Sequence, residues 1–140
     1  MQIITAPDPR LRVKTKKVER MTPEIQQHIE EMLDLVESGL GLAAPQVGLD
    51  LSIFVTNYQG RKVFINPEIT LSGDLFEIEE GCMSLPGVVE RMQRYSHVEM
   101  LARNKNMEIV RVEANGMGAV ILQHEYDHLQ GILISDGNVV

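Results

Sequence analysis

The sequence lacks several features that would assign it to a specialised class of protein. Its only cysteine, Cys82, has no intramolecular partner, so disulfides do not hold this fold together and a reducing compartment is expected. No run of about 18 apolar residues suggests a membrane span, and the opening MQIITAPDPR lacks the charged-then-apolar order of a signal peptide. We therefore expect a cytoplasmic protein, in the host cytoplasm if a phage encodes it.

An excess of basic residues is also missing. The chain has 13 Lys and Arg against 20 Asp and Glu, and its net charge of -7 opposes broad binding to nucleic-acid phosphates. The one local exception, RLRVKTKK at residues 10–17, is typical of a solvated loop or sheet edge. Internal repeats and long flexible linkers are absent as well. With 44% hydrophobic residues, the 140 residues suit one domain, spanning 1–140.

Hydrophobic periodicity predicts a helix at each end of a region of short strands. The first helix is expected from Thr22 as N-cap to Ser38, with Gly39 as its stop, and the second from Asn115 to Gln130, with Gly131 as a left-handed cap. Between them, runs bounded by Gly, Pro and Asn read as separate strands: 51–56, 61–66, 69–80, 89–95, 97–103 and 107–113. This predicts an α+β fold, with antiparallel-rich β-sheets packed around the C-terminal helix and one N-terminal helix.

The second predicted helix contains HEYDH, residues 124–128. His124 and His128 are four residues apart, so on a helix both imidazoles can be directed at one metal ion. Glu125 lies beside them, where its carboxylate can reach a water in an open position of the metal and act as general base. The alternative is a chance match on an ordinary helix, which the specificity of the motif disfavours.

A hydrolytic metal centre normally has three protein ligands. The glutamate of thermolysin-like proteases has no counterpart after His128, and Ile134 occupies the position of the third metzincin histidine. Upstream, EEGCMSLPG offers Cys82 on a tight turn that follows a predicted strand. A lone cysteine is more often a small buried apolar residue, but beside an incomplete ligand set it is the candidate third ligand.

A third stretch, GLGLAAPQVG at residues 39–48, is rich in small residues. It lacks the Lys-Ser/Thr ending of a phosphate loop and the spacing of a dinucleotide fingerprint. Its small residues permit close approach by another chain, and Gln46 offers an amide donor to a developing oxyanion. By itself the stretch would be read as a structural turn.

Together GLGLAAPQ, EGCMS and HEYDH resemble the three motifs of peptide deformylase, and the resemblance extends to PDPRLR and FINPEI. It implies a hydrolase that removes the N-formyl group from the formylmethionine of newly made polypeptides and releases formate. The weaker alternatives are an HExxH metallopeptidase that cuts internal bonds of unformylated peptides, and a catalytically idle metal-binding domain. The latter would be expected to have lost Glu125 or Gln46.

The resemblance implies a role for each matching residue. The metal ligands of the family fall on Cys82, His124 and His128. Its catalytic glutamate falls on Glu125, and its oxyanion donors on Gln46 and the backbone N–H of Met83, where the family usually has leucine. The backbone of Gly41 is expected to hold the peptide. The pocket for the methionine side chain is expected to be lined by Leu40, Ile78, Met117, Val120 and Ile121.

The resemblance also implies one divalent metal ion, Fe(II) natively, with Zn(II) or Ni(II) able to occupy the site. A thiolate ligand lowers the Lewis acidity of the ion and is consistent with iron. Asp127 is either a solvent-facing carboxylate or an acceptor that orients a ligand. The expected partners are formylmethionyl nascent peptides. We expect a monomer that binds ribosomes weakly, because the C-terminal docking helix of bacterial relatives has no counterpart after GILISDGNVV.

Overall fold

The computed structural model describes residues 1–137, so the last three residues of the expected 1–140 domain lie outside the described part. Its elements are, in order, η1 (Pro9–Arg12), α1 (Pro23–Leu35), β1 (Gly41–Ala43), η2 (Ala44–Val47), β2 (Ile53–Asn57), β3 (Arg61–Cys82), β4 (Leu85–Arg103), β5 (Ile109–Asn115), α2 (Gly116–Leu129) and η3 (Ile134–Asp136). The fold is α+β, as predicted. Among the described residues, no helix combines the length and the apolar composition needed to cross a membrane.

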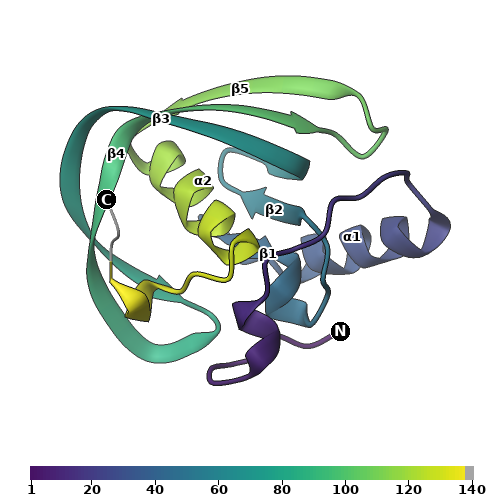
Figure 1. The fold of residues 1–140 in the computed structure, drawn as a ribbon, viewed down its shortest axis with the longest axis horizontal. Helices are drawn as coiled ribbons and strands as arrows, with labels where there is room; N and C mark the ends of the chain where they lie inside the picture. The colour runs from purple at the N-terminus through teal and green to yellow at the C-terminus, as the bar shows by residue number, and fades with distance from the viewer. Residues whose placement is uncertain (138–140) are drawn as a thin grey trace.

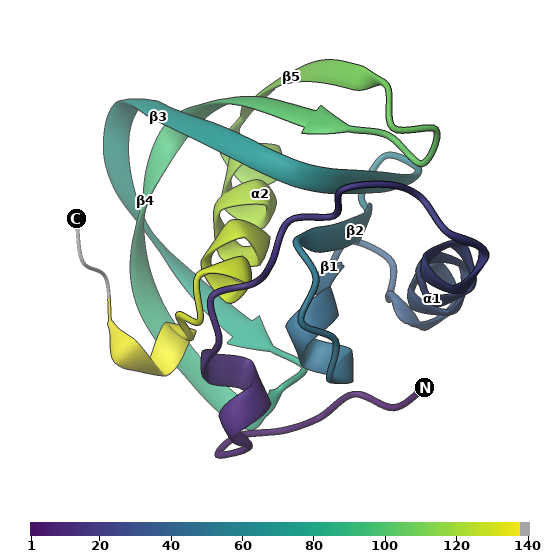
Figure 2. The ribbon, with the colours of Figure 1, turned by 45° about the vertical axis from the view of Figure 1, so that its right-hand side comes forward.

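The five strands form one antiparallel sheet in which each strand pairs with its neighbours in the chain, in the order β1-β2-β3-β4-β5. Figures 1 and 2 show that the long strands β3 and β4 curve around α2, while α1 lies beside β1 and β2, away from α2. The motif-bearing helix is therefore central, as the sequence predicts.

The helix caps follow the sequence signals, with one exception. The Thr22 hydroxyl accepts a hydrogen bond from the Ile25 N–H at 3.2 Å and begins α1. The helix ends at Leu35 rather than near Ser38, because Val36 adopts an extended conformation and its side chain is buried in the core. Gly39 was therefore wrongly predicted as the stop. Gly131, with φ +76°, follows α2 in the left-handed conformation predicted for it.

The predicted separation of the strands is wrong. The runs 61–66 and 69–80 belong to the single strand β3, and the runs 89–95 and 97–103 belong to β4. The Asn66-Pro67 signal marks a register shift inside β3 instead of a strand end, and Asn66 has a positive φ there. A second register shift lies at Gly73, inside the predicted run 69–80. The short strand β1 was missed, because three residues are too few to show a periodic pattern.

Two layers of core lie on either side of β1 and β2. Leu42, Ile53 and Val55 pack toward the side that contains Ile29 and Met32 of α1. Their neighbours along the strands pack on the side of α2, in the cluster of Ala43, Phe54, Phe64, Ala119 and Leu122. Burying a side chain such as Phe54 contributes roughly 1.5–3 kcal/mol. This double burial fixes β1 beside α2, and so fixes the segment 39–46 against the HEYDH motif.

Candidate active site

The three predicted ligand residues converge, although they come from two distant segments. Cys82 is the last residue of β3, and His124 and His128 project from successive turns of α2. The two histidine Nε2 atoms are 3.2 Å apart, and the Cys82 Sγ lies 3.4 Å from the His128 Nε2. All three ligand atoms lie within 4.8 Å of one another.

This donor set fits a metal ion. Ligand atoms bound at about 2.0–2.3 Å in tetrahedral geometry are separated by distances of this size. Burial and the neighbouring His124 hold the pKa of His128 well below its usual range, so His128 presents a neutral imidazole, the form that binds metals. Burial also lowers the pKa of His124, but the Glu125 carboxylate and the Cys82 and Glu80 side chains raise it overall, to about 10. The groups around His124 therefore stabilise a positive charge at its position.

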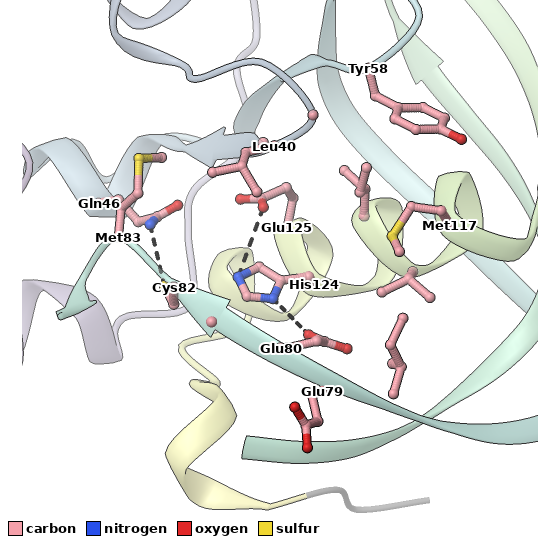
Figure 3. A pocket seen from close by; sticks show the side chains of 16 residues that line it. Leu40, Gln46, Tyr58, Glu79, Glu80, Cys82, Met83, Met117, His124 and Glu125 are labelled. Atoms are coloured by element: carbon pink, nitrogen blue, oxygen red, sulfur yellow. Dashed lines mark hydrogen bonds and ion pairs between the residues drawn. The ribbon is translucent and has the colours of Figure 1, made fainter. Parts of the chain in front are cut away.

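His124 is oriented by Glu80, a residue that the sequence analysis missed. The His124 Nδ1–H donates to the Glu80 carboxylate at 2.8 Å (Figure 3). This leaves the His124 Nε2 free to lie 3.2 Å from the His128 Nε2. Glu80 stands two residues before Cys82 on β3. Because side chains on a strand alternate with period two, this spacing could have revealed that both lie on one face.

A buried arginine supports Glu80. Arg94 on β4 donates to both Glu80 oxygens at 2.7 and 2.8 Å and to Asp127 at 2.7 Å. Burial raises the pKa of Glu80, but its hydrogen bonds to Arg94 and His124 bring it down to about 2. Asp127 therefore neither orients a histidine nor faces solvent freely, and its interaction is with Arg94.

The Glu125 side chain is 3% exposed, and its Oε2 lies 3.9 Å from the His124 Nε2 (Figure 3). Burial raises the pKa of Glu125 to about 7, although the His124 charge opposes this rise. Gly41 of β1 packs against it so closely that a Cβ at position 41 would lie 2.5 Å from the Glu125 Cγ. The close packing explains why a glycine is needed at position 41.

The side-chain amide of Gln46, on η2, is hydrogen-bonded through both its oxygen and its nitrogen. Its Oε1 accepts from the Ala43 N–H at 2.9 Å, and its Nε2 donates to the Ser84 hydroxyl at 3.2 Å. The same Nε2 lies 3.6 Å from the Cys82 Sγ. The amide donor is thus held beside the ligand cluster, next to the turn that contains Met83.

A cavity of about 660 Å³ opens beside these groups. Its wall includes Gln46, Cys82, Met83, His124 and Glu125 at the polar end. The six residues expected to bind substrate also line it: Leu40, Gly41, Ile78, Met117, Val120 and Ile121. Tyr58 and Glu79 also line the cavity and were not anticipated. A volume of this size is typical of small-molecule and peptide-end sites.

Comparisons with known proteins agree with this geometry. The sequence model described as "Polypeptide deformylase" matches residues 1–138. The chain is 43% identical to a peptide deformylase of Hahella chejuensis, covering 97% of this chain and 85% of that protein. It is 39% identical to one of Dictyoglomus turgidum, covering 97% and 91%.

Solved structures give the same result. The crystal structure of peptide deformylase from Thermotoga maritima superposes with a TM-score of 0.90 at 35% identity, covering 96% of this chain and 95% of that one. A peptide deformylase from Synechococcus elongatus, in complex with actinonin, superposes with a TM-score of 0.90 at 36% identity, covering 97% and 79%. The chain belongs to the polypeptide deformylase family, whose enzymes remove the N-formyl group from nascent peptides.

Proposed function

We propose that Cys82, His124 and His128 hold the metal ion on which this family depends, and that Glu125 is the general base. The observation that carries the proposal is the convergence of the three ligand atoms within 4.8 Å beside a buried carboxylate and a cavity. When bound, the ion supplies a Lewis acid that lowers the pKa of water and polarises the formyl oxygen. The remaining chemistry belongs to side chains and backbone of this chain.

Glu125 takes a proton from the attacking water and returns it to the leaving amine. Because burial raises its pKa to about 7, the carboxylate can both accept and release a proton near neutral pH. Its contact with Gly41 restricts its movement, so the carboxylate stays directed at the cavity. Proton transfer by a positioned group of this kind contributes about 10²–10⁴-fold to rate.

Two donors stabilise the negative charge that develops on the formyl oxygen. Gln46 provides its side-chain amide, which is pre-oriented by the bonds to Ala43 and Ser84. The backbone N–H of Met83 provides the second, so the exchange of leucine for methionine at this position leaves the donor intact. Donors fixed in advance need no reorganisation during the reaction.

The methionine side chain of the substrate occupies the apolar part of the cavity. Ile78, Val120 and Ile121 form its inner wall, and Leu40 and Met117, 40% and 48% exposed, form its rim. The backbone at Gly41 holds the peptide along β1. Exposed apolar residues at a rim are consistent with a surface that a peptide covers.

For the metal, we propose Fe(II) as the native ion, with Zn(II) or Ni(II) able to replace it. A thiolate ligand beside a redox-active ion is open to oxidation. The Fe(II) form is therefore expected to lose activity in air faster than the Ni(II) form. Equal half-lives of the two forms under oxygen would count against this assignment.

We further propose that residues 1–140 form a single catalytic domain that works as a monomer in the cytoplasm. Its partners are formylmethionyl nascent peptides, with weak ribosome affinity and no direct binding to nucleic acid. The net charge of -7 supports this, because phosphate contacts require clustered basic residues. Co-sedimentation with ribosomes at about 0.1 M salt, where surface charges are screened beyond about 10 Å, tests it.

The decisive experiment compares formylated and unformylated methionyl peptides of the same sequence. Release of formate from the first, with no cleavage of internal bonds in the second, is expected. Cleavage of the unformylated peptide would instead indicate a metallopeptidase, and bound metal without turnover would indicate an idle binding domain. Cys82→Ala should lose metal in the same preparations, measured by elemental analysis.

A further inference from the structure

A second cavity, of about 250 Å³, lies next to the substrate cavity. Two residues, Tyr58 and Ile121, line both cavities. On the far side of them the second cavity is bounded by apolar residues such as Phe64, Val112 and Leu122. Its lining also includes polar and charged side chains, among them Gln59, Lys62 and Glu113. Tyr58 and Ile121 therefore form a wall between the substrate cavity and the second cavity.

Tyr58 is held at this wall by a tight hairpin. It follows Asn57, the last residue of β2, which pairs with Arg61, the first residue of β3. The intervening Gln59 and Gly60 both have positive φ, 54° and 101°, as a short loop between antiparallel strands requires. In Figure 3 the Tyr58 ring lies beside Met117, at the end of the cavity away from Cys82.

The ring packs on a helix position that has no side chain. A Cβ at Gly118 would lie 3.6 Å from the Tyr58 Cε2, which is ordinary van der Waals contact. Within residues 1–137 no hydrogen bond or ion pair involves the Tyr58 hydroxyl. The Tyr58 ring is thus held by the hairpin and by packing. A side chain at position 118 would project toward the space that this ring fills.

We propose that Tyr58 is a specificity-determining residue that limits the length of the N-terminal side chain accepted by the substrate cavity. This inference rests on the proposed function, because it takes the apolar part of the cavity as the site of the first side chain. Removing the ring joins the 660 Å³ cavity to the 250 Å³ cavity behind it. Linear aliphatic side chains longer than methionine then gain space toward Phe64, Val112 and Leu122.

The test uses two formylated peptides that differ only in their first residue, methionine or 2-aminodecanoic acid. The measured quantity is the ratio of kcat/KM for the long side chain to kcat/KM for methionine. Tyr58→Ala should raise this ratio about tenfold or more. The long side chain has four more heavy atoms than methionine, and a single methylene group in a pocket already changes kcat/KM by about tenfold. Binding of both peptides to the Glu125→Gln variant, with and without Tyr58→Ala, gives the same comparison without turnover.

Matched variants distinguish the loss of the Tyr58 ring from a general disruption of the fold. Tyr58→Phe keeps the ring and should leave the ratio unchanged. Adding Gly118→Leu to Tyr58→Ala refills the vacated space from the helix and should return the ratio toward the wild-type value. If Tyr58→Ala does not fold, Tyr58→Leu replaces it, with a smaller rise expected.

An unchanged ratio in the folded Tyr58→Ala or Tyr58→Leu variant, with the methionine peptide still turned over, would overturn the proposal and leave the proposed function standing. A metal-loaded wild type that releases no formate from the methionine peptide would instead reject the proposed function.

Discussion

Two arginines on β4, three residues apart, are in opposite environments. Arg91, 68% exposed, contacts Glu77 at 3.4 Å and Glu79 at 3.9 Å on the outer face of the β3–β4 ribbon. Arg94, 4% exposed, binds Glu80 and Asp127 on the inner face, behind His124. The same chemical pairing thus occurs on both faces of one ribbon, but of the two pairs only the inner one holds a carboxylate, Glu80, that is hydrogen-bonded to His124.

Burial, more than the pairing itself, therefore decides how much an ion pair contributes to stability. An exposed pair is screened by water and contributes about 0–1 kcal/mol. Removing one member of a buried pair leaves a desolvated charge without a partner and costs about 3–5 kcal/mol. The inner pair also fixes Glu80, and through it the orientation of His124. The predictions below test whether the two faces differ as much as this reasoning requires.

The largest effect is expected for Arg94→Met. The substitution keeps an unbranched apolar stem but leaves Glu80 and Asp127 without their cation, so the metal-free protein should lose about 3–5 kcal/mol of unfolding free energy. Urea unfolding at equilibrium measures it. The added substitution Glu80→Gln should recover part of this loss, because it removes one of the stranded charges. A loss below about 1 kcal/mol would show that the inner pair is no more important than the outer one.

Acid should remove the contribution of Glu80 in a defined range. Its pKa is about 2 in the folded protein, below the 4.5 of an unperturbed glutamate. Because the folded value is the lower one, the stabilisation is complete above pH 4.5 and is lost as the pH falls toward 2. The difference between these two pKa values corresponds to roughly 3 kcal/mol. The stability difference between wild type and Glu80→Gln should shrink over this range, and a difference independent of pH would contradict the assignment.

Glu125→Gln tests another buried carboxylate of the site, which lies on α2 and has a proposed chemical role. It should retain the metal and the fold but lower kcat by a factor on the order of a hundred or more, about 2.7 kcal/mol in activation free energy. Steady-state kinetics together with metal analysis measure this. Near-normal turnover with bound metal would exclude Glu125 as the base.

The smallest effect is expected for Arg91→Met, the matched control on the outer face. The exposed contacts with Glu77 and Glu79 should contribute so little that the unfolding free energy changes by no more than about 0.5 kcal/mol. The kcat for a formylmethionyl peptide should also remain unchanged. An effect as large as that of Arg94→Met would remove the distinction between the two faces.

Much of the site could be predicted from the sequence because its signals are local. The i, i+4 spacing of His124 and His128, the Thr22 cap and the left-handed Gly131 each depend on a few neighbouring residues. Cys82 was predicted because an incomplete ligand set required a third donor. Glu125 and Gln46 were predicted from their places in HEYDH and GLGLAAPQVG, and the resemblance to a known family implies the same roles. The boundary between the first two runs of β3 failed, because a proline such as Pro67 is as common at a bulge as at a strand end.

Local sequence patterns specify the two helices, the candidate metal ligands and the family. Which charges are buried, and where the cavity ends, depends on the tertiary structure. Arg94 meets Glu80 and Asp127 because the long ribbon curves around α2, and these contacts join residues 14 and 33 positions apart. The Tyr58 ring lies at the end of the cavity because the β2–β3 hairpin packs against Gly118 of α2. Such contacts depend on how distant segments pack, which local periodicity does not encode.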